Sequence, residues 1–200
     1  MALDLETTGL SPVADEIIEV GAVKFRGSEV VDTFHSLVNP RRTLPYRIQM
    51  LTGIAPAELE KAPPWAVVAG DVASFIGGHP VVGQNVAFDL GFLSTRGVQP
   101  SGPAYDTFEL AYILLPRLAE YSLAALAASL GVPPGKQHRA LSDAQMTAGV
   151  FQALLERAAQ LPPQVLSRMV ELTRGADWPL ARVLASIAEG TRSARYIVKD

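Results

Sequence analysis

Apolar and polar residues alternate in the N-terminal part of the chain, which predicts strands there. Leu3 and Leu5 alternate with Asp4 and Glu6, so the first strand should have one apolar and one acidic face. Two longer strands follow, and the turn residues between them indicate a hairpin. We expect these strands at residues 17–25 and 29–38, on either side of Arg26-Gly27-Ser28.

Beyond residue 64 the apolar residues follow helical spacing instead. The pattern runs from Trp65 to Ile76 and stops at Gly77-Gly78. Ser122 is a typical N-terminal cap of a helix, and Gly131 is a typical residue at which a helix ends. We expect helices at residues 65–76, 85–96, 122–130 and 140–160, and a short buried strand at residues 80–82.

Antiparallel strands followed by alternating strands and helices predict an α/β fold with a mixed central sheet. Pro162-Pro163 marks a boundary, after which two more helices are expected at residues 165–173 and 180–189. We therefore predict a main domain over residues 1–161. Residues 162–200 would form a C-terminal helical extension or the start of a linker to a further domain.

The composition restricts the chemistry of any site. The 200 residues include no cysteine, so disulfides, thiolate zinc sites and thiol nucleophiles are excluded. A metal would bind carboxylates, carbonyls or one of the three histidines, which favours hard cations. The net charge of −3 disfavours a broad basic face that wraps duplex DNA. With no tract of ~20 apolar residues and no basic-then-apolar leader, we expect a soluble, cytoplasmic protein that does not contact a membrane.

Three short segments carry candidate chemistry. Asp4 and Glu6 project from the same face of a strand, about 7 Å apart along the backbone, and can converge on one cation. Asp89 follows a buried strand and lies in the first turn of a helix, near its positive end. His138 lies in a loop, and Asp143 in the first turn of the helix after it. Taken singly, each segment has an ordinary structural explanation, as a solvated strand, a helix cap or a surface histidine.

Together these residues make a stronger physical case. Carboxylates ~4 Å apart repel by roughly 4 kcal/mol per pair at an effective dielectric constant of 20, so the fold must protonate them or bind cations. Two divalent cations would remove the conflict and stabilise the attacking and leaving oxygens of a phosphodiester. A base for the attacking water is then needed, and a histidine side chain can accept a proton at neutral pH. The other histidines, His35 and His79, are assigned structural roles.

The three segments resemble the motifs of the DnaQ-like exonucleases of the DEDDh branch, in order and over roughly residues 1–161. The first motif is Leu3-Asp4-Leu5-Glu6-Thr7-Thr8-Gly9-Leu10, and the second is Gly83-Gln84-Asn85-Val86-Ala87-Phe88-Asp89. The third is His138-Arg139-Ala140-Leu141-Ser142-Asp143-Ala144.

This resemblance implies a ribonuclease H-like fold, two Mg²⁺ or Mn²⁺ ions, and release of nucleoside monophosphates from a 3′ end. It makes His138 the general base and places Leu51-Thr52-Gly53-Ile54 near the terminal base. Asp106 matches an acid that recurs in relatives, and we expect it to have a structural capping role. By position, the metal ligands would be Asp4, Glu6, Asp89 and Asp143, and the substrate-binding residues Thr7, Thr8, Thr52 and Phe88.

The subfamily and substrate are open at this point. The runs 106–111 and 121–126 look like the polymerase III epsilon group and the exonuclease domains fused to DinG-type helicases, which favours single-stranded DNA and a fused helicase or polymerase. An RNA-trimming exonuclease of the same fold and a catalytically silent nucleic-acid-binding module are the alternatives. A dinucleotide-binding domain of Rossmann type lacks support, because no glycine-rich phosphate loop follows a predicted strand.

Overall fold

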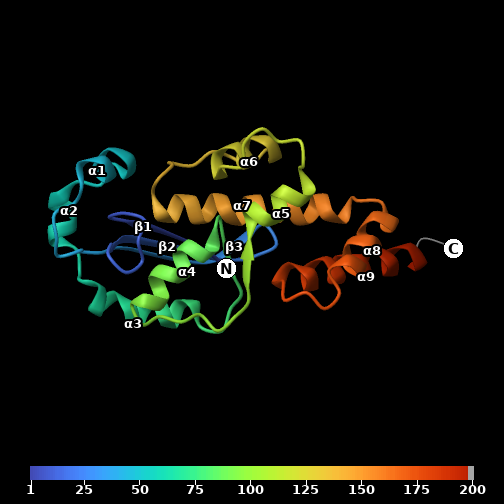
Figure 1. The fold of residues 1–200 in the computed structure, drawn as a ribbon, viewed down its shortest axis with the longest axis horizontal. Coiled ribbons are helices and arrows are strands. Elements are labelled where there is room, and N and C mark those ends of the chain that lie inside the picture. The colour runs from blue at the N-terminus through green and yellow to red at the C-terminus, as the bar shows by residue number, and fades with distance from the viewer. Residues whose placement is uncertain (198–200) are drawn as a thin grey trace.

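The computed structural model describes residues 1–197, which form a mixed five-stranded sheet with helices on both faces (Figure 1). The strand order is β3-β2-β1-β4-β5. The first three strands are antiparallel, and β4 and β5 run parallel to β1. The strands are β1 (Ala2–Thr7), β2 (Ile17–Arg26), β3 (Glu29–Leu37), β4 (Val81–Gly83) and β5 (Ala104–Asp106). The predicted α/β, ribonuclease H-like architecture is confirmed.

The helices form two layers around this sheet. In Figure 1 the sheet lies between α7 above and α3 and α4 below, and α5 and α6 pack on α7. The helices are α1 (Tyr46–Thr52), α2 (Pro56–Lys61), α3 (Trp65–Ile76), α4 (Val86–Thr95), α5 (Thr107–Leu114), α6 (Leu123–Leu130), α7 (Ala140–Ala159), α8 (Pro163–Leu172) and α9 (Pro179–Ile197).

Apolar and acidic side chains alternate along β1, so its two faces pack against different helix layers. Leu3 and Leu5 belong to the core formed with Val72 and Phe92 of the lower helices. Ala2 packs against Ala144 of α7 on the other face. Because side chains alternate across a strand, Asp4 and Glu6 point toward the α7 layer. This arrangement places the acidic face next to the helix that carries Asp143.

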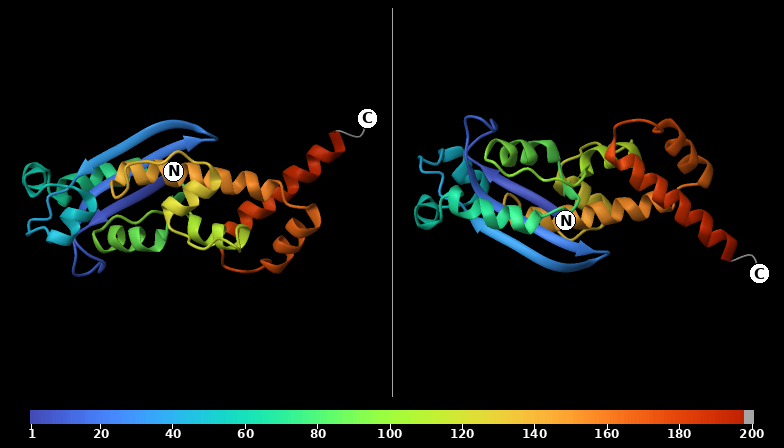
Figure 2. Two further views of the ribbon diagram at one scale, coloured as in Figure 1. Left: turned by 90° about the horizontal axis from the view of Figure 1, so that it is seen from above. Right: turned by 90° about the horizontal axis from the view of Figure 1, so that it is seen from below.

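The C-terminal helices pack at the far end of α7, opposite α1 and α2 (Figure 2). Leu166 of α8 and Leu180 and Leu184 of α9 share a buried core with Leu154 of α7. The two predicted C-terminal helices are therefore present, and α9 is longer than expected. Residues 198–200, the end of the predicted extension, lie outside the described residues. Within residues 1–197, no helix is long and apolar enough to cross a membrane.

Four short elements were missed by the sequence analysis: α1, α2, β5 and α5. Each has three to eight residues, too few for a periodic pattern to emerge above chance. The predicted capping role of Asp106 is confirmed, and it is broader than expected. Its carboxylate accepts hydrogen bonds from the Phe108 N–H at the start of α5 and from the Asn85 and Val86 N–H groups at the start of α4.

Candidate active site

The first two acidic residues lie on β1, Asp4 in its middle and Glu6 near its end. Glu6 is buried and Asp4 half-buried, although both face away from the apolar core below the sheet. In the β1–β2 register, Glu6 lies directly opposite Glu19. The strand therefore holds two carboxylates on one face, with a third on the neighbouring strand.

Asp89 is fixed against the same strand from α4. It lies in the first turn of that helix and is 3% exposed. The Leu5 N–H donates a hydrogen bond of 3.0 Å to the Asp89 Oδ1. This bond joins the second predicted motif to the middle of the first, across 84 residues of sequence.

His138 and Asp143 form a compact turn at the start of α7. The His138 N–H donates a hydrogen bond of 2.7 Å to the Asp143 Oδ2, and His138 adopts a positive φ of 57°. The Asp143 side chain is buried and that of His138 is exposed. Ligand atoms of Glu6, His138 and Asp143 all lie within 4.8 Å of one another.

One pocket of about 480 Å³ collects these groups. The structure thus brings together all the residues predicted to be catalytic, which come from β1, α4 and the start of α7. The five predicted catalytic residues that line the pocket are Asp4, Glu6, Asp89, His138 and Asp143. Gln84, Phe88 and residues of α6 complete the lining.

Burial, together with neighbouring carboxylates, raises the pKa values of these acids. Burial, with the charges of Asp143 and Glu19, raises the pKa of Glu6 to about 8. Burial and the nearby Asp89, Glu6 and Asp143 raise the pKa of Asp4 well above its usual range. Burial also raises the pKa of Asp89 and of Asp143. A group of hard oxygen donors that resists ionisation in this way fits divalent cations, whose charge would relieve the repulsion.

We expect the metal-free protein to lose stability as the pH rises from about 4.5 to about 8. In this window the folded protein keeps a proton on Glu6 that the unfolded chain has released, because the folded pKa is about 8 and the ordinary value is 4.5. The stabilisation is lost as the pH rises through the folded pKa, and it amounts to a few kcal/mol, on the order of one per pKa unit. Melting temperatures in EDTA across this range measure it.

The Glu6→Gln variant is the control for this pH effect. Its melting temperature should depend less on pH, because the amide does not titrate. Mn²⁺ added at the upper end of the range should restore the melting temperature of the unmodified protein. A pH profile equally steep in Glu6→Gln would show that another group is responsible.

Glu19 is a residue of this region that the sequence analysis missed. It is 1% exposed, and its carboxylate accepts hydrogen bonds from Arg139 Nε and one terminal nitrogen, and from the Ala140 N–H. His35 Nε2 lies 2.7 Å from its Oε1, which gives His35 the structural role that was expected. Burial acts to raise the pKa of Glu19, but these hydrogen bonds together lower it.

The contacts of Glu19 attach the start of α7 to β2. Gly21 adds to this attachment, because a Cβ there would lie 2.1 Å from the Ala140 backbone. The sequence does hold a signal for Glu19. It is a charged residue inside the apolar run Ile17-Ile18-Glu19-Val20, and a buried charge requires a partner.

We expect Arg139→Ala to lower the free energy of unfolding by about 3 kcal/mol, because it leaves the charge of Glu19 buried without its main partner. Urea denaturation measures the difference. Arg168→Ala is the matched control, since the Arg168–Glu171 pair is largely exposed and should contribute under ~1 kcal/mol. Equal losses in the two variants would mean that the Glu19 pair stabilises no more than a surface pair.

The predicted substrate-binding residues divide into two groups. Thr7 and Phe88 line a second pocket, of about 510 Å³, which adjoins the first and shares Leu5, Glu6 and Phe88 with it. Thr8 and Thr52 line neither pocket. The Thr8 hydroxyl donates to Asp15, and the buried Thr52 hydroxyl donates to the Ile48 carbonyl, so both hold local backbone in place.

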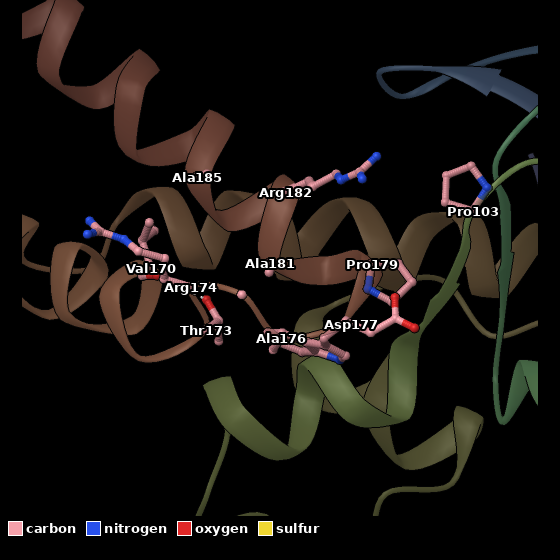
Figure 3. Close-up of a pocket in the computed structure, with 12 residues that line it drawn as sticks. Pro103, Val170, Thr173, Arg174, Ala176, Asp177, Pro179, Ala181, Arg182 and Ala185 are labelled. Carbon is pink, nitrogen blue, oxygen red and sulfur yellow. Dashed lines mark hydrogen bonds between the residues drawn. The ribbon is translucent and has the colours of Figure 1, made fainter.

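A further pocket of about 480 Å³ lies between α8 and α9 (Figure 3). Arg174, Asp177 and Arg182 border it, and the two arginine side chains point away from each other. No second carboxylate lines it among the described residues, so it lacks a comparable metal-ligand set.

Comparison with known proteins gives consistent results. The family model RNase_T, described as an exonuclease, matches residues 1–151. The chain is 34% identical to the PolC-type DNA polymerase III of Thermotoga maritima over 210 residues, which is 100% of this chain and 15% of that protein. It is 35% identical to the 3′-5′ exonuclease DinG of Bacillus subtilis over 180 residues, which is 87% of this chain and 19% of that protein.

Solved structures share the fold. Exonuclease X, in complex with 5′-overhanging duplex DNA, has a TM-score of 0.63 at 25% identity, covering 94% of this chain and 98% of that chain. Escherichia coli exonuclease I, in complex with a dT13 oligonucleotide, has a TM-score of 0.68 at 19% identity, covering 84% of this chain and 42% of that chain. At its lower identity, the second match is a likeness of fold. The chain spans less than a fifth of the length of the two sequence relatives.

Proposed function

This chain belongs to the exonuclease family RNase_T, and we propose that it hydrolyses single-stranded DNA from the 3′ end with release of nucleoside monophosphates. The observation that carries this proposal is the convergence of four carboxylates and one histidine on a single pocket. That pocket adjoins a second, largely apolar one, which offers space for the terminal nucleotide.

In the proposed mechanism, Asp4, Glu6, Asp89 and Asp143 would hold two divalent cations, Mg²⁺ or Mn²⁺. When bound, such ions neutralise the carboxylates and supply charge stabilisation to the attacking and leaving oxygens. The buried acids are held in position by the protein itself, Asp89 by the Leu5 N–H and Asp143 by the His138 N–H. Little reorganisation of these ligands is then needed during the reaction.

His138 is the proposed general base. Its side chain is exposed at the mouth of the pocket, so it can reach a water molecule and return the proton to solvent. The positive φ of His138 and the hydrogen bond from its N–H to Asp143 direct the side chain from a fixed turn. Thr7 and Phe88 would contact the terminal nucleotide, and Thr8 and Thr52 would act by supporting the segments beside it.

We also propose that residues 1–161 hold this activity and that residues 162–200 are an extension attached to α7. The family match ends at residue 151, while α8 and α9 share the core of α7. Two relatives are named as a PolC-type DNA polymerase III and as DinG, which favours DNA as the substrate and a fused polymerase or helicase as the setting.

Digestion of 5′-labelled single-stranded DNA and RNA of equal sequence, with Mn²⁺ or with EDTA, tests the proposal. We expect a ladder of shortened DNA and free mononucleotides, both lost with EDTA. Faster cleavage of RNA would make the enzyme an RNA-trimming exonuclease. No cleavage of either polymer would instead support a silent nucleic-acid-binding module.

A further inference from the structure

Beside the active-site pocket, three aromatic side chains, two of them exposed and one partly buried, form a cluster that no step of the proposed reaction uses. We propose that Phe108, Tyr112 and Tyr121, here called the aromatic platform, stack on nucleobases of the substrate strand on the 5′ side of the scissile bond. This inference rests on the proposed function and extends it to how the strand is held.

The three rings contact one another, and those of Phe108 and Tyr112 are exposed while Tyr121 is partly buried. The ring centroids of Phe108 and Tyr112 are 6.2 Å apart, and these two rings are stacked. The centroid of Tyr121 lies 5.8 Å from that of Phe108 and 5.3 Å from that of Tyr112. Tyr112 is 62% exposed and Phe108 is 37% exposed. A cluster of exposed aromatic rings is unusual on a soluble surface, where it tends to mark a binding site.

The aromatic platform is joined to the pocket by one direct hydrogen bond and by the chain itself. Gln84, which lines the pocket, donates from Nε2 to the Tyr121 carbonyl at 2.7 Å. The Tyr121 hydroxyl donates to the Leu115 carbonyl, which fixes the ring. The neighbours of Tyr121 in sequence, Glu120 and Ser122, both line the pocket. A strand leaving the pocket over this wall would therefore meet the rings next.

The chemistry of the surface fits bases better than phosphates. The ring faces carry no charge, and every base has a π-face that can stack on them whatever the sequence. Glu120, the sequence neighbour of Tyr121, is exposed and lines the pocket. Its charge would repel the phosphate backbone, so a strand would pass here with its bases toward the protein. Tyr112 has the most exposed side chain of the three, so it should contribute most to binding of the strand.

Steady-state cleavage of a dinucleotide, a tetranucleotide and an octanucleotide of DNA tests this inference. We expect Tyr112→Ala to raise KM for the octanucleotide about tenfold, as loss of one base–aromatic stack implies, while kcat and the cleavage of the dinucleotide stay unchanged. Tyr112→Phe keeps the ring and should behave as the unmodified protein. Leu172→Ala, which truncates an equally exposed apolar side chain on α8, is the matched control.

A single abasic site, moved stepwise along the octanucleotide from its 3′ end, identifies the stacked base. One abasic position should raise KM for the unmodified protein and have no further effect in Tyr112→Ala. An unchanged KM for Tyr112→Ala on every length would overturn the inference and leave the rings to a partner protein. Failure of the unmodified protein to cleave any oligonucleotide would instead reject the proposed function.

Discussion

We expect Asp4→Asn to lose at least ~10³-fold in kcat/KM on single-stranded DNA, because the variant lacks a proposed metal ligand worth several kcal/mol of transition-state stabilisation. The same change should make the metal-free protein more stable. Burial and four neighbouring carboxylates disfavour the ionised form of Asp4, and the amide is neutral. Mononucleotide release with Mn²⁺ measures the first effect, and the melting temperature in EDTA measures the second. Both are taken at neutral pH on one preparation.

The opposite signs of these two effects make the experiment informative. A variant that simply misfolds would lose activity and stability together. Asp71→Asn, an exposed carboxylate on α3, is the matched control and should change neither quantity. Unchanged activity in Asp4→Asn would remove this residue from the metal site, and lower stability would contradict the repulsion between the acids.

The second large effect is expected for His138→Ala. If His138 is the general base as proposed, its loss should lower kcat by ~10² to 10⁴, with little change in the affinity for Mn²⁺. The affinity measurement is needed because a His138 nitrogen lies as close to Glu6 and Asp143 as a metal ligand would. Single-turnover cleavage gives the rate, and calorimetric titration with Mn²⁺ gives the affinity.

His79→Ala is the control for this variant, since His79 is an exposed histidine that lines neither active-site pocket. Its rate should equal that of the unmodified protein. If His138→Ala weakens Mn²⁺ binding as strongly as it lowers the rate, His138 is a ligand. If the rate is unchanged, the proton must leave by another route.

The amino-acid sequence by itself determined the local structure that carries the site. Alternation in β1 placed Asp4 and Glu6 on one face, and the buried strand before Asn85 placed Asp89 in the first turn of a helix. The long amphipathic segment after His138 determined α7. These features depend on residues close in sequence, whose periodicity and caps act before any tertiary contact forms. The three motifs could therefore be recognised from the sequence alone.

Tertiary structure decided which distant residues meet. Glu19 meets the Ala140 N–H across 121 residues, and Leu5 meets Asp89 across 84, and no local pattern specifies such pairs. Local patterns also did not show that Thr8 and Thr52 bond to nearby residues and line neither pocket. Nor did they show the aromatic platform, whose rings come from α5 and the loop after it. Periodicity reports the face on which a side chain lies, whereas the partner on that face is chosen by how whole helices and strands pack.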